Sequence, residues 1–107
     1  MTNHSNNLYT LITGSSVGIG RALAIECAKR NMNLLLIDLP DAKLESTVNY
    51  LTKNYSVQIH CFKIDLTAPN APEAIYNYCT DHAIAVNMLI NNAGMGHLGS
   101  FCDSDHR

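Results

Sequence analysis

Short apolar runs alternate with helical periodicities along most of the 107-residue chain. Residues 8–13 predict a first strand, and residues 34–38 are apolar up to the last position, as in a strand that is covered on both faces. Residues 57–64 alternate between apolar and polar positions, which predicts a more exposed edge strand. Residues 86–91 predict a fourth strand.

Three predicted helices separate these strands. The first ends near Arg30 and has one small and apolar face, made of Gly20, Leu23, Ala24, Cys27 and Ala28. In the second, which Asp41 can cap, apolar residues recur at Leu44, Val48, Leu51 and Tyr55. The third starts at Ala71 and Pro72, because proline suits the first turn of a helix, and ends near Ile84.

The element order β-α-β-α-β-α-β predicts an α/β fold. Right-handed crossovers of this kind build a parallel sheet with helices on both faces, which is half of a Rossmann-type doubly wound fold. We expect residues 8–107 to form a partial domain, truncated after the fourth strand, and the polar residues 1–7 to be disordered. Gly94, Gly96 and Gly99 predict a loop after the last strand.

Composition and charge exclude several classes of protein. The hydrophobic fraction of 47% and the charged fraction of 15% are those of an ordinary globular chain. A net charge of -2 with only 7 basic residues argues against a nucleic-acid partner. The longest aliphatic run, residues 34–37, is far shorter than the roughly 20 residues that span a bilayer. Without a secretory signal at the N-terminus, we expect a cytoplasmic protein.

The four cysteines are widely spaced, with no Cys-x-x-Cys pair, so we expect free thiols in a reducing compartment. Cys79 with His82, and Cys102 with His106, have spacings that metal ligands can have. A structural zinc site needs four closely placed ligands, however, and we expect no metal site.

A glycine-rich segment joins the first strand to the first helix. Residues 13–20 are Thr-Gly-Ser-Ser-Val-Gly-Ile-Gly, at a position where free N–H groups and the helix dipole favour an anion such as a pyrophosphate. Gly14 can make the turn out of the strand and Gly18 lets the backbone approach phosphates, while Gly20 permits close packing of the helix on the sheet.

Three alternatives exist for this segment. A glycine-rich turn with no ligand is one. A phosphate-binding loop of the NTPase type needs Gly-Lys-Ser or Gly-Lys-Thr, whereas Gly20 is followed by Arg21. Residues 14–18 match the Gly-x-Ser-x-Gly elbow of serine hydrolases, but fewer than fourteen residues precede them to supply an oxyanion-hole loop.

Asp38 ends the second strand 18 residues after Gly20, where a carboxylate can accept hydrogen bonds from ribose hydroxyls. A 2′-phosphate at this position would meet a negative charge. Neither Val17 nor Leu39 supplies the basic side chain that would favour NADP, so NAD is the expected cofactor.

Residues 13–20 together with Asn91-Asn92-Ala93-Gly94 resemble the short-chain dehydrogenase/reductase family, and the resemblance covers residues 8–107. It implies a partial NAD(P)-binding domain in which Asp65 contacts the adenine and Asn92 ties the central strands together. Without it, residues 91–94 would be interpreted as a strand end and a turn, with or without a ligand role. The cofactor-binding residues that motif and resemblance together predict are Gly14, Ser15, Ser16, Val17, Gly18, Ile19, Gly20, Asp38, Leu39, Asp65, Leu66, Asn91, Ala93 and Gly94.

The resemblance also implies a reaction: hydride transfer between a nicotinamide and a carbonyl or alcohol substrate, with a Ser and a Tyr-x-x-x-Lys as catalytic groups. None of the five tyrosines is followed by a lysine four residues later. We therefore expect the catalytic residues to lie beyond Arg107 and the chain to be inactive alone. The alternative is a short nucleotide-binding protein without catalysis.

The family's sheet order, 3-2-1-4-5-6-7, makes the fourth strand central. In this chain it would be an unpaired edge, so we expect the chain alone to be marginally stable and to associate through that edge. The resemblance implies homo-oligomers for full-length members.

Overall fold

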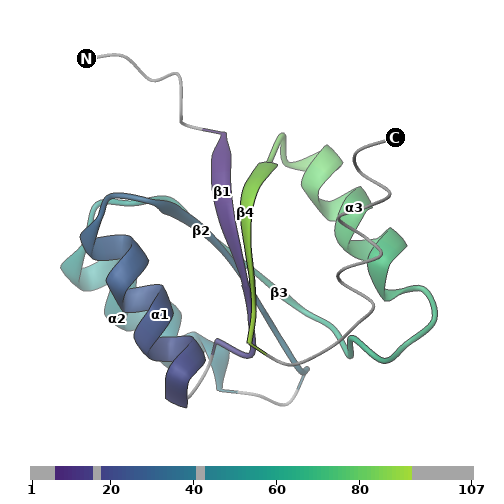
Figure 1. Cartoon of the computed structure of the whole chain (residues 1–107), viewed down its shortest axis with the longest axis horizontal. Coiled ribbons are helices and arrows are strands. Elements are labelled where there is room, and N and C mark those ends of the chain that lie inside the picture. Colours follow the sequence, from purple (N-terminus) through teal and green to yellow (C-terminus); the bar gives the residue numbers. More distant parts are fainter. Residues whose placement is uncertain (1–6, 16–17, 41–42, 93–107) are drawn as a thin grey trace.

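The structure is a computed structural model that describes residues 7–15, 18–40 and 43–92. The described part holds four strands and three helices in the predicted alternating order (Figure 1). In chain order they are β1 (Leu8–Thr13), α1 (Gly18–Lys29), β2 (Asn33–Asp38), α2 (Leu44–Asn54), β3 (Ile59–Lys63), α3 (Ala71–Asp81) and β4 (Ala85–Asn91).

All strand pairs are parallel, and the sheet has the order β3-β2-β1-β4. This confirms the α/β class and the Rossmann-type arrangement. It also matches the first four strands of the order that the resemblance implied. β1 is central and almost wholly buried, because its side chains contact helices on both sides of the sheet.

Two apolar clusters, one on each face, hold the helices to the sheet. On one face, α1 and α2 pack on Ile12, Leu34 and Leu36, with Leu44 and Leu51 fully buried between helix and sheet. α3 packs on the opposite face (Figure 1). The residues of this second cluster are Tyr9, Leu11, Leu35, Ile37, Leu66, Ile75, Cys79 and Ile84. Alternate residues of β1 and β2 therefore point to opposite faces, as the strand period requires.

Two helix ends differ from the sequence prediction. The predicted Asp41 cap is wrong: α2 begins at Leu44, Lys43 occupies the N-cap position, and no side chain caps the helix there. Asp41 itself lies outside the described residues. α3 ends at Asp81 rather than near Ile84, because Ala83 takes a left-handed conformation with φ 55° and turns the chain toward β4.

The edge strand β3 is shorter than the predicted 57–64 stretch. Its ladder starts at Ile59 because the preceding Gln58 N–H donates to the side chain of Asn33 rather than to a strand carbonyl. The predicted alternation is present. Val57 and Ile59 contact the cluster under α1 and α2, whereas Phe62 contacts the cluster under α3.

β4 pairs with β1 and has no second partner within the described part of the chain. Its side chains are exposed or half-buried, and Met88 is 47% exposed. The disorder expected at residues 1–7 and the domain boundary at residue 8 stay predictions.

Candidate functional site

The turn after β1 adopts the conformations that its glycines allow. Gly14 has φ 65° and Gly18 has φ 61°, both in the left-handed region that L side chains disfavour. The Gly14 N–H donates to the Ile37 carbonyl at 2.9 Å, so the turn is joined to the end of β2. Ser16 and Val17, between these glycines, lie outside the described residues.

Gly20 holds the start of α1 against the end of β1. A Cβ atom on Gly20 would lie 1.9 Å from the Gly14 carbonyl oxygen and 2.9 Å from Asn92 Nδ2. No side chain fits there, so the predicted role of Gly20 in close packing is confirmed. The first turn of α1 thus presents its N–H groups beside the ends of the central strands, where an anion would be favoured.

Side chains at and just after the end of β4 contact the end of β1 and the turn. Asn92 Nδ2 donates to the Gly14 carbonyl at 3.2 Å, and Thr13 Oγ1 lies 3.1 Å from Asn91 Oδ1. These contacts join segments 78 residues apart. The role that the resemblance implied for Asn92, tying the central strands together, is thus visible as a hydrogen bond.

Ser15 is fully buried beside α2. Its carbonyl accepts a hydrogen bond from Thr47 Oγ1 at 3.2 Å, while its own hydroxyl has no partner within the described part of the chain. Thr47 was not among the residues predicted from the sequence. It could have been predicted as a polar residue on the apolar face of the helix, three positions after Leu44.

A cavity of about 420 Å³ opens beside the glycine turn. It lies where β1, β2 and β3 end, which is where open α/β sheets bind their ligands. Its lining residues are Gly14, Asp38, Leu39, Ile64, Asp65, Leu66 and Thr67. Five of the predicted cofactor-binding residues are thus brought together. Ile64 and Thr67 also line the cavity, although neither was among the predicted cofactor-binding residues.

Both acidic side chains of the cavity are held by nearby donors. Asp38 Oδ1 accepts the Leu39 N–H at 2.8 Å. Asp65 Oδ1 accepts the Thr67 hydroxyl at 2.7 Å and the Thr67 N–H at 2.9 Å. These bonds, from the hydroxyl first and the N–H second, hold the pKa of the Asp65 carboxyl below its usual value. Asp65 is therefore an anion at neutral pH.

Two predicted site residues that the structure describes, Ile19 and Asn91, are not among the residues that line the cavity. Ile19 is 70% exposed on the first turn of α1, and Asn91 is exposed at the end of β4. Ala93 and Gly94 lie outside the described residues. Roles for these four residues stay predictions.

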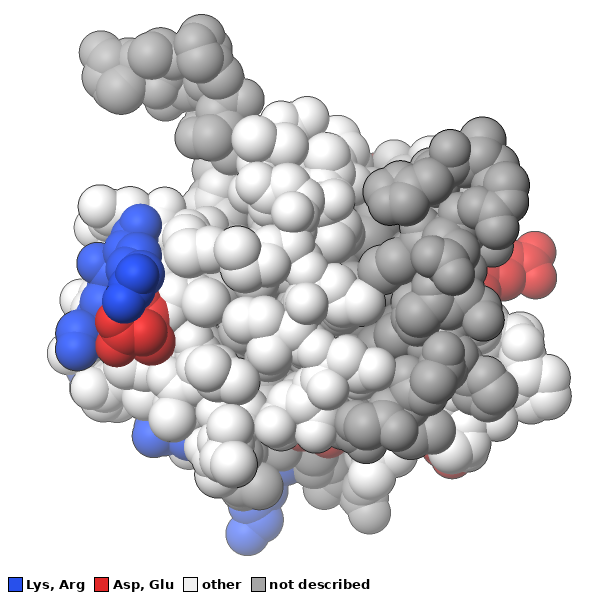
Figure 2. Space-filling view, in the orientation of Figure 1, with Lys and Arg blue, Asp and Glu red and all other residues white. Residues whose placement is uncertain are grey.

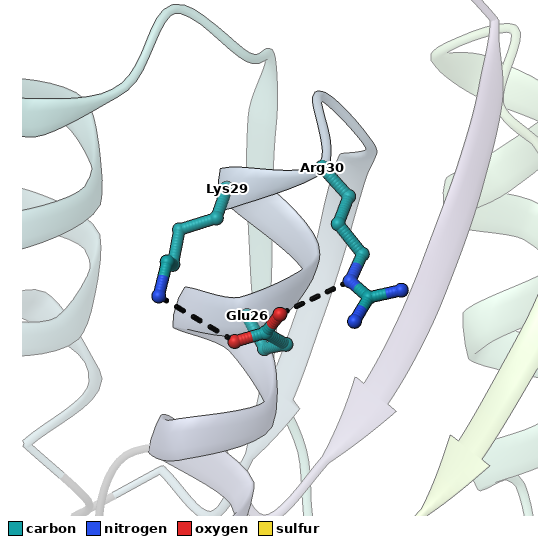
Figure 3. A network of polar contacts seen from close by, with 3 residues as sticks. All are labelled: Glu26, Lys29 and Arg30. Atoms are coloured by element: carbon teal, nitrogen blue, oxygen red, sulfur yellow. Dashed lines mark hydrogen bonds and ion pairs between the residues drawn. The ribbon is translucent and has the colours of Figure 1, made fainter.

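Two basic residues at the C-terminal end of α1, Lys29 and the following Arg30, are paired with an acidic neighbour. On the face in Figure 2, basic and acidic side chains lie side by side over α1, and most of the remaining described surface is uncharged. Glu26 contacts Lys29 at 3.7 Å and Arg30 at 3.0 Å (Figure 3). All three side chains are solvent-exposed, so these pairs contribute little to stability, but they prevent a uniformly basic patch here.

The residues of the alternative chemistries lie partly outside the described part of the chain. No group of three or more His, Cys, Asp or Glu side chains within them could hold a metal ion. Ser16, the candidate hydrolase nucleophile, and Cys102 and His106 lie outside the described part. No helix that the structure describes is long and apolar enough to cross a membrane.

Residues 9–107 match the short chain dehydrogenase family. The chain belongs to this family. The match confirms the resemblance carried by residues 13–20 and 91–94, and it agrees with the glycine turn, the parallel sheet and the cavity at its edge.

Several short-chain dehydrogenase relatives are similar over most of this chain. A very-long-chain 3-oxoacyl-CoA reductase of Vanderwaltozyma polyspora is 36% identical over 94 residues, which are 86% of this chain and 26% of the relative. The hydroxysteroid dehydrogenase-like protein 1 of Gallus gallus is 34% identical, over 81% of this chain and 26% of its own length. The chain thus spans about a quarter of the length of these relatives.

Solved structures of short-chain dehydrogenases share the fold. A bulky-bulky ketone specific alcohol dehydrogenase from Comamonas testosteroni is 33% identical with a TM-score of 0.69, covering 84% of this chain and 37% of that chain. An L-sorbose reductase from Gluconobacter frateurii, complexed with NADPH and L-sorbose, is 27% identical with a TM-score of 0.74, covering 83% and 34%.

Proposed function

We propose that this chain binds a nicotinamide dinucleotide, with the pyrophosphate at the glycine turn and the adenosine in the adjoining cavity. The observation that carries the proposal is that Gly14, which belongs to both the turn and the cavity wall, and Asp38 line the same cavity. This is where a doubly wound sheet accommodates a dinucleotide.

The residues of the turn fit such a cofactor. The space at Gly20 is filled by backbone, so α1 starts directly beside the turn with its first N–H groups free of helical partners. The buried Ser15 hydroxyl, which lacks a partner among the described residues, is a further group that a phosphate oxygen could satisfy. Ser16, Val17 and Ile19 complete the proposed phosphate-binding segment.

The acidic cavity supports NAD over NADP. Asp38 and Asp65 both line it, and none of the lining residues that the structure describes is Lys or Arg. A 2′-phosphate would meet one or two carboxylates without a compensating cation. The L-sorbose reductase and a short-chain dehydrogenase from Sphingobium yanoikuyae are complexed with NADPH, so relatives do use NADP. The proposed preference rests on the charges of this chain alone.

We propose further that the whole protein is an oxidoreductase acting on a carbonyl or alcohol substrate, as the names of its relatives indicate for them. The bound cofactor would supply hydride transfer at its nicotinamide. Residues of this chain would bind and orient it: the glycine turn at the phosphates, Asp38 and Leu39 at the ribose, Asp65 and Leu66 at the base, and Asn91, Ala93 and Gly94 along the adenosine and ribose side. The Ser and Tyr-x-x-x-Lys are proposed to lie outside residues 1–107. Cytoplasmic localisation and homo-oligomers stay predictions.

Titration with NADH and with NADPH tests the cofactor proposal. We expect NADH to bind at least about tenfold more tightly, since one charge repulsion of roughly 1.4 kcal/mol changes affinity tenfold. Asp38→Asn should reduce this ratio by raising the affinity for NADPH. The matched control Asp81→Asn removes the same charge at the end of α3, where the chain turns toward the start of β4. It should leave the ratio unchanged. Equal affinities, or equal effects of both substitutions, would contradict the proposal.

A further inference from the structure

Two histidines from different elements lie next to each other at the C-terminal end of α3. His60 is in the edge strand β3, and His82 is the C-cap residue of α3. Their ring centres are 5.2 Å apart and their ring planes are inclined at 67°, so the two rings do not stack on each other. His60 is half-buried and His82 is exposed, so this pair of rings lies at the surface.

The backbone of Tyr78 determines which nitrogen of His82 can bind a ligand. His82 Nδ1 lies 2.9 Å from the Tyr78 carbonyl oxygen. A carbonyl only accepts hydrogen bonds, so Nδ1 of the neutral ring carries the proton and Nε2 carries the lone pair. Histidines that bind metal ions are usually held in this way, because their other ring nitrogen donates to a carbonyl or a carboxylate.

The side chain of the same tyrosine contacts His60. The Tyr78 hydroxyl lies 3.0 Å from His60 Nδ1, and a hydroxyl can accept a hydrogen bond as well as donate one. When the Nδ1–H of His60 donates to this hydroxyl, the lone pair of His60 is on Nε2 as well. Tyr78 thus holds both imidazoles through Nδ1, and its ring stacks on that of His82 with centres 4.0 Å apart.

The separation of the two rings fits two ligands of one metal ion. Zinc–nitrogen bonds of about 2.0–2.1 Å at a tetrahedral angle put the centres of two imidazoles roughly 5 Å apart. Imidazole nitrogen is a suitable ligand for Zn²⁺, Ni²⁺ and Cu²⁺, whereas Mg²⁺ and Ca²⁺ prefer oxygen.

The partner of His82 differs from the one that the sequence spacing suggested. Cys79 is buried in the apolar cluster between α3 and the sheet. Within the described residues no third His, Cys, Asp or Glu side chain forms a metal-binding group with the two histidines. A metal ion held by this pair therefore has two protein ligands, both of them imidazoles.

We propose that His60 and His82 bind a divalent transition-metal ion of the zinc type through their Nε2 atoms, with water in the other coordination positions. The ion joins the edge strand β3 to the end of α3 and so stabilises the packing of α3 on the sheet. The site is separate from the proposed nucleotide site, because neither histidine lines the cavity.

Calorimetric titration and thermal unfolding with Zn²⁺ test the proposal, above neutral pH and with the cysteines kept reduced. The wild-type chain is compared with His60→Gln and His82→Gln. His4→Gln is the matched control, because it makes the same change in the N-terminal segment. Cys61→Ser removes the exposed thiol that follows His60 in the sequence. Mg²⁺ is the control ion.

Zn²⁺ should raise the midpoint of thermal unfolding of the wild type in a concentration-dependent way, as a ligand of the folded state does. His60→Gln and His82→Gln should each weaken binding at least about tenfold, since even changes to residues behind the ligands often have this effect. His4→Gln and Cys61→Ser should keep the dissociation constant within about twofold of the wild type, and Mg²⁺ should not raise the midpoint.

The proposal is overturned if the folded wild type does not bind Zn²⁺, or if either histidine substitution leaves the affinity within about twofold of the wild type. Loss of binding in Cys61→Ser would also overturn it, because the thiol would then be a ligand. His82→Gln changes an exposed side chain, so it provides the test if His60→Gln does not fold.

Discussion

At the scale of single residues, Gly20 shows how one missing side chain positions the candidate site. Its Cα faces the Gly14 carbonyl so closely that α1 and β1 would have to separate to admit even a methyl group. Gly18 differs: it has open space for a Cβ atom, and only its left-handed backbone conformation disfavours a side chain.

This difference gives a first prediction. Gly20→Ala should lower the free energy of unfolding by about 2 kcal/mol, the usual effect of overpacking, and should weaken NADH binding because the turn shifts. Gly18→Ala should cost only about 1 kcal/mol, for the left-handed conformation. Urea unfolding of both variants measures the difference. If Gly20→Ala proves no more destabilising than Gly18→Ala, the close approach of α1 to β1 is not a constraint on the fold.

His60 gives a second prediction at the residue scale, away from the cavity. Its ring lies between Tyr9, Tyr78 and His82, and its Nδ1 is 3.0 Å from the Tyr78 hydroxyl. Burial first, and the charge of His82 second, lower the pKa of His60 below its ordinary value. The folded state therefore binds a proton at His60 less readily than the unfolded state does.

The sign of the pH dependence follows. The contribution of neutral His60 is fully present above the unfolded pKa of about 6.5 and is lost as the pH falls from there through the lower folded pKa. Thermal unfolding between neutral pH and mild acid should show this loss, and His60→Gln should make it smaller. The same acid-induced loss in wild type and variant would show that His60 is not responsible.

At the scale of elements, α1 and α3 end in the same way without a glycine. Asn31 and Ala83 follow the two helices with φ 62° and 55°. In each case the next N–H reaches back to close the last turn, from Met32 to Cys27 and from Ile84 to Cys79. Glycine is the usual residue at this position, and asparagine tolerates it better than alanine does.

Ala83→Gly should therefore raise the free energy of unfolding by up to about 1 kcal/mol, because it relieves the left-handed alanine at an exposed site. Asn31→Gly is the matched control, with an expected change of only a few tenths of a kcal/mol. Chemical denaturation of the two variants provides the comparison. A destabilised Ala83→Gly protein would mean that this helix end is not under strain.

Local sequence patterns predicted the elements and much of the candidate site. The periods of strands and helices and the glycine turn can be recognised from residues that are close together in the sequence. The exceptions depend on partners far along the chain. Thr47 reaches Ser15 across 32 residues, a contact that no local pattern encodes. The missing Asp41 cap is another exception, since a residue suited to capping fixes a helix start only where the chain geometry allows it.

At the scale of the whole molecule, the fold brings the ends of three parallel strands to one cavity. The aromatic and histidine cluster around His60 lies apart from this cavity, between the sheet and α3. Asp38 ends β2, and Asp65 follows two residues after the end of the neighbouring strand β3. The pairing of these strands runs in register from Leu34 with Ile59 to Asp38 with Lys63. Their arrival at one cavity is therefore a consequence of strand order. The sequence alone indicated this order only through the family resemblance.

An NMR titration of the chain with NADH, following its backbone amides, tests the central claim most directly. The account predicts shifts at Gly14, Gly20, Asp38, Asp65 and Thr67, with little change at His60 and His82. No shifts in a folded sample, or shifts centred on the His60 cluster, would contradict the assignment of the cavity and glycine turn as the nucleotide site.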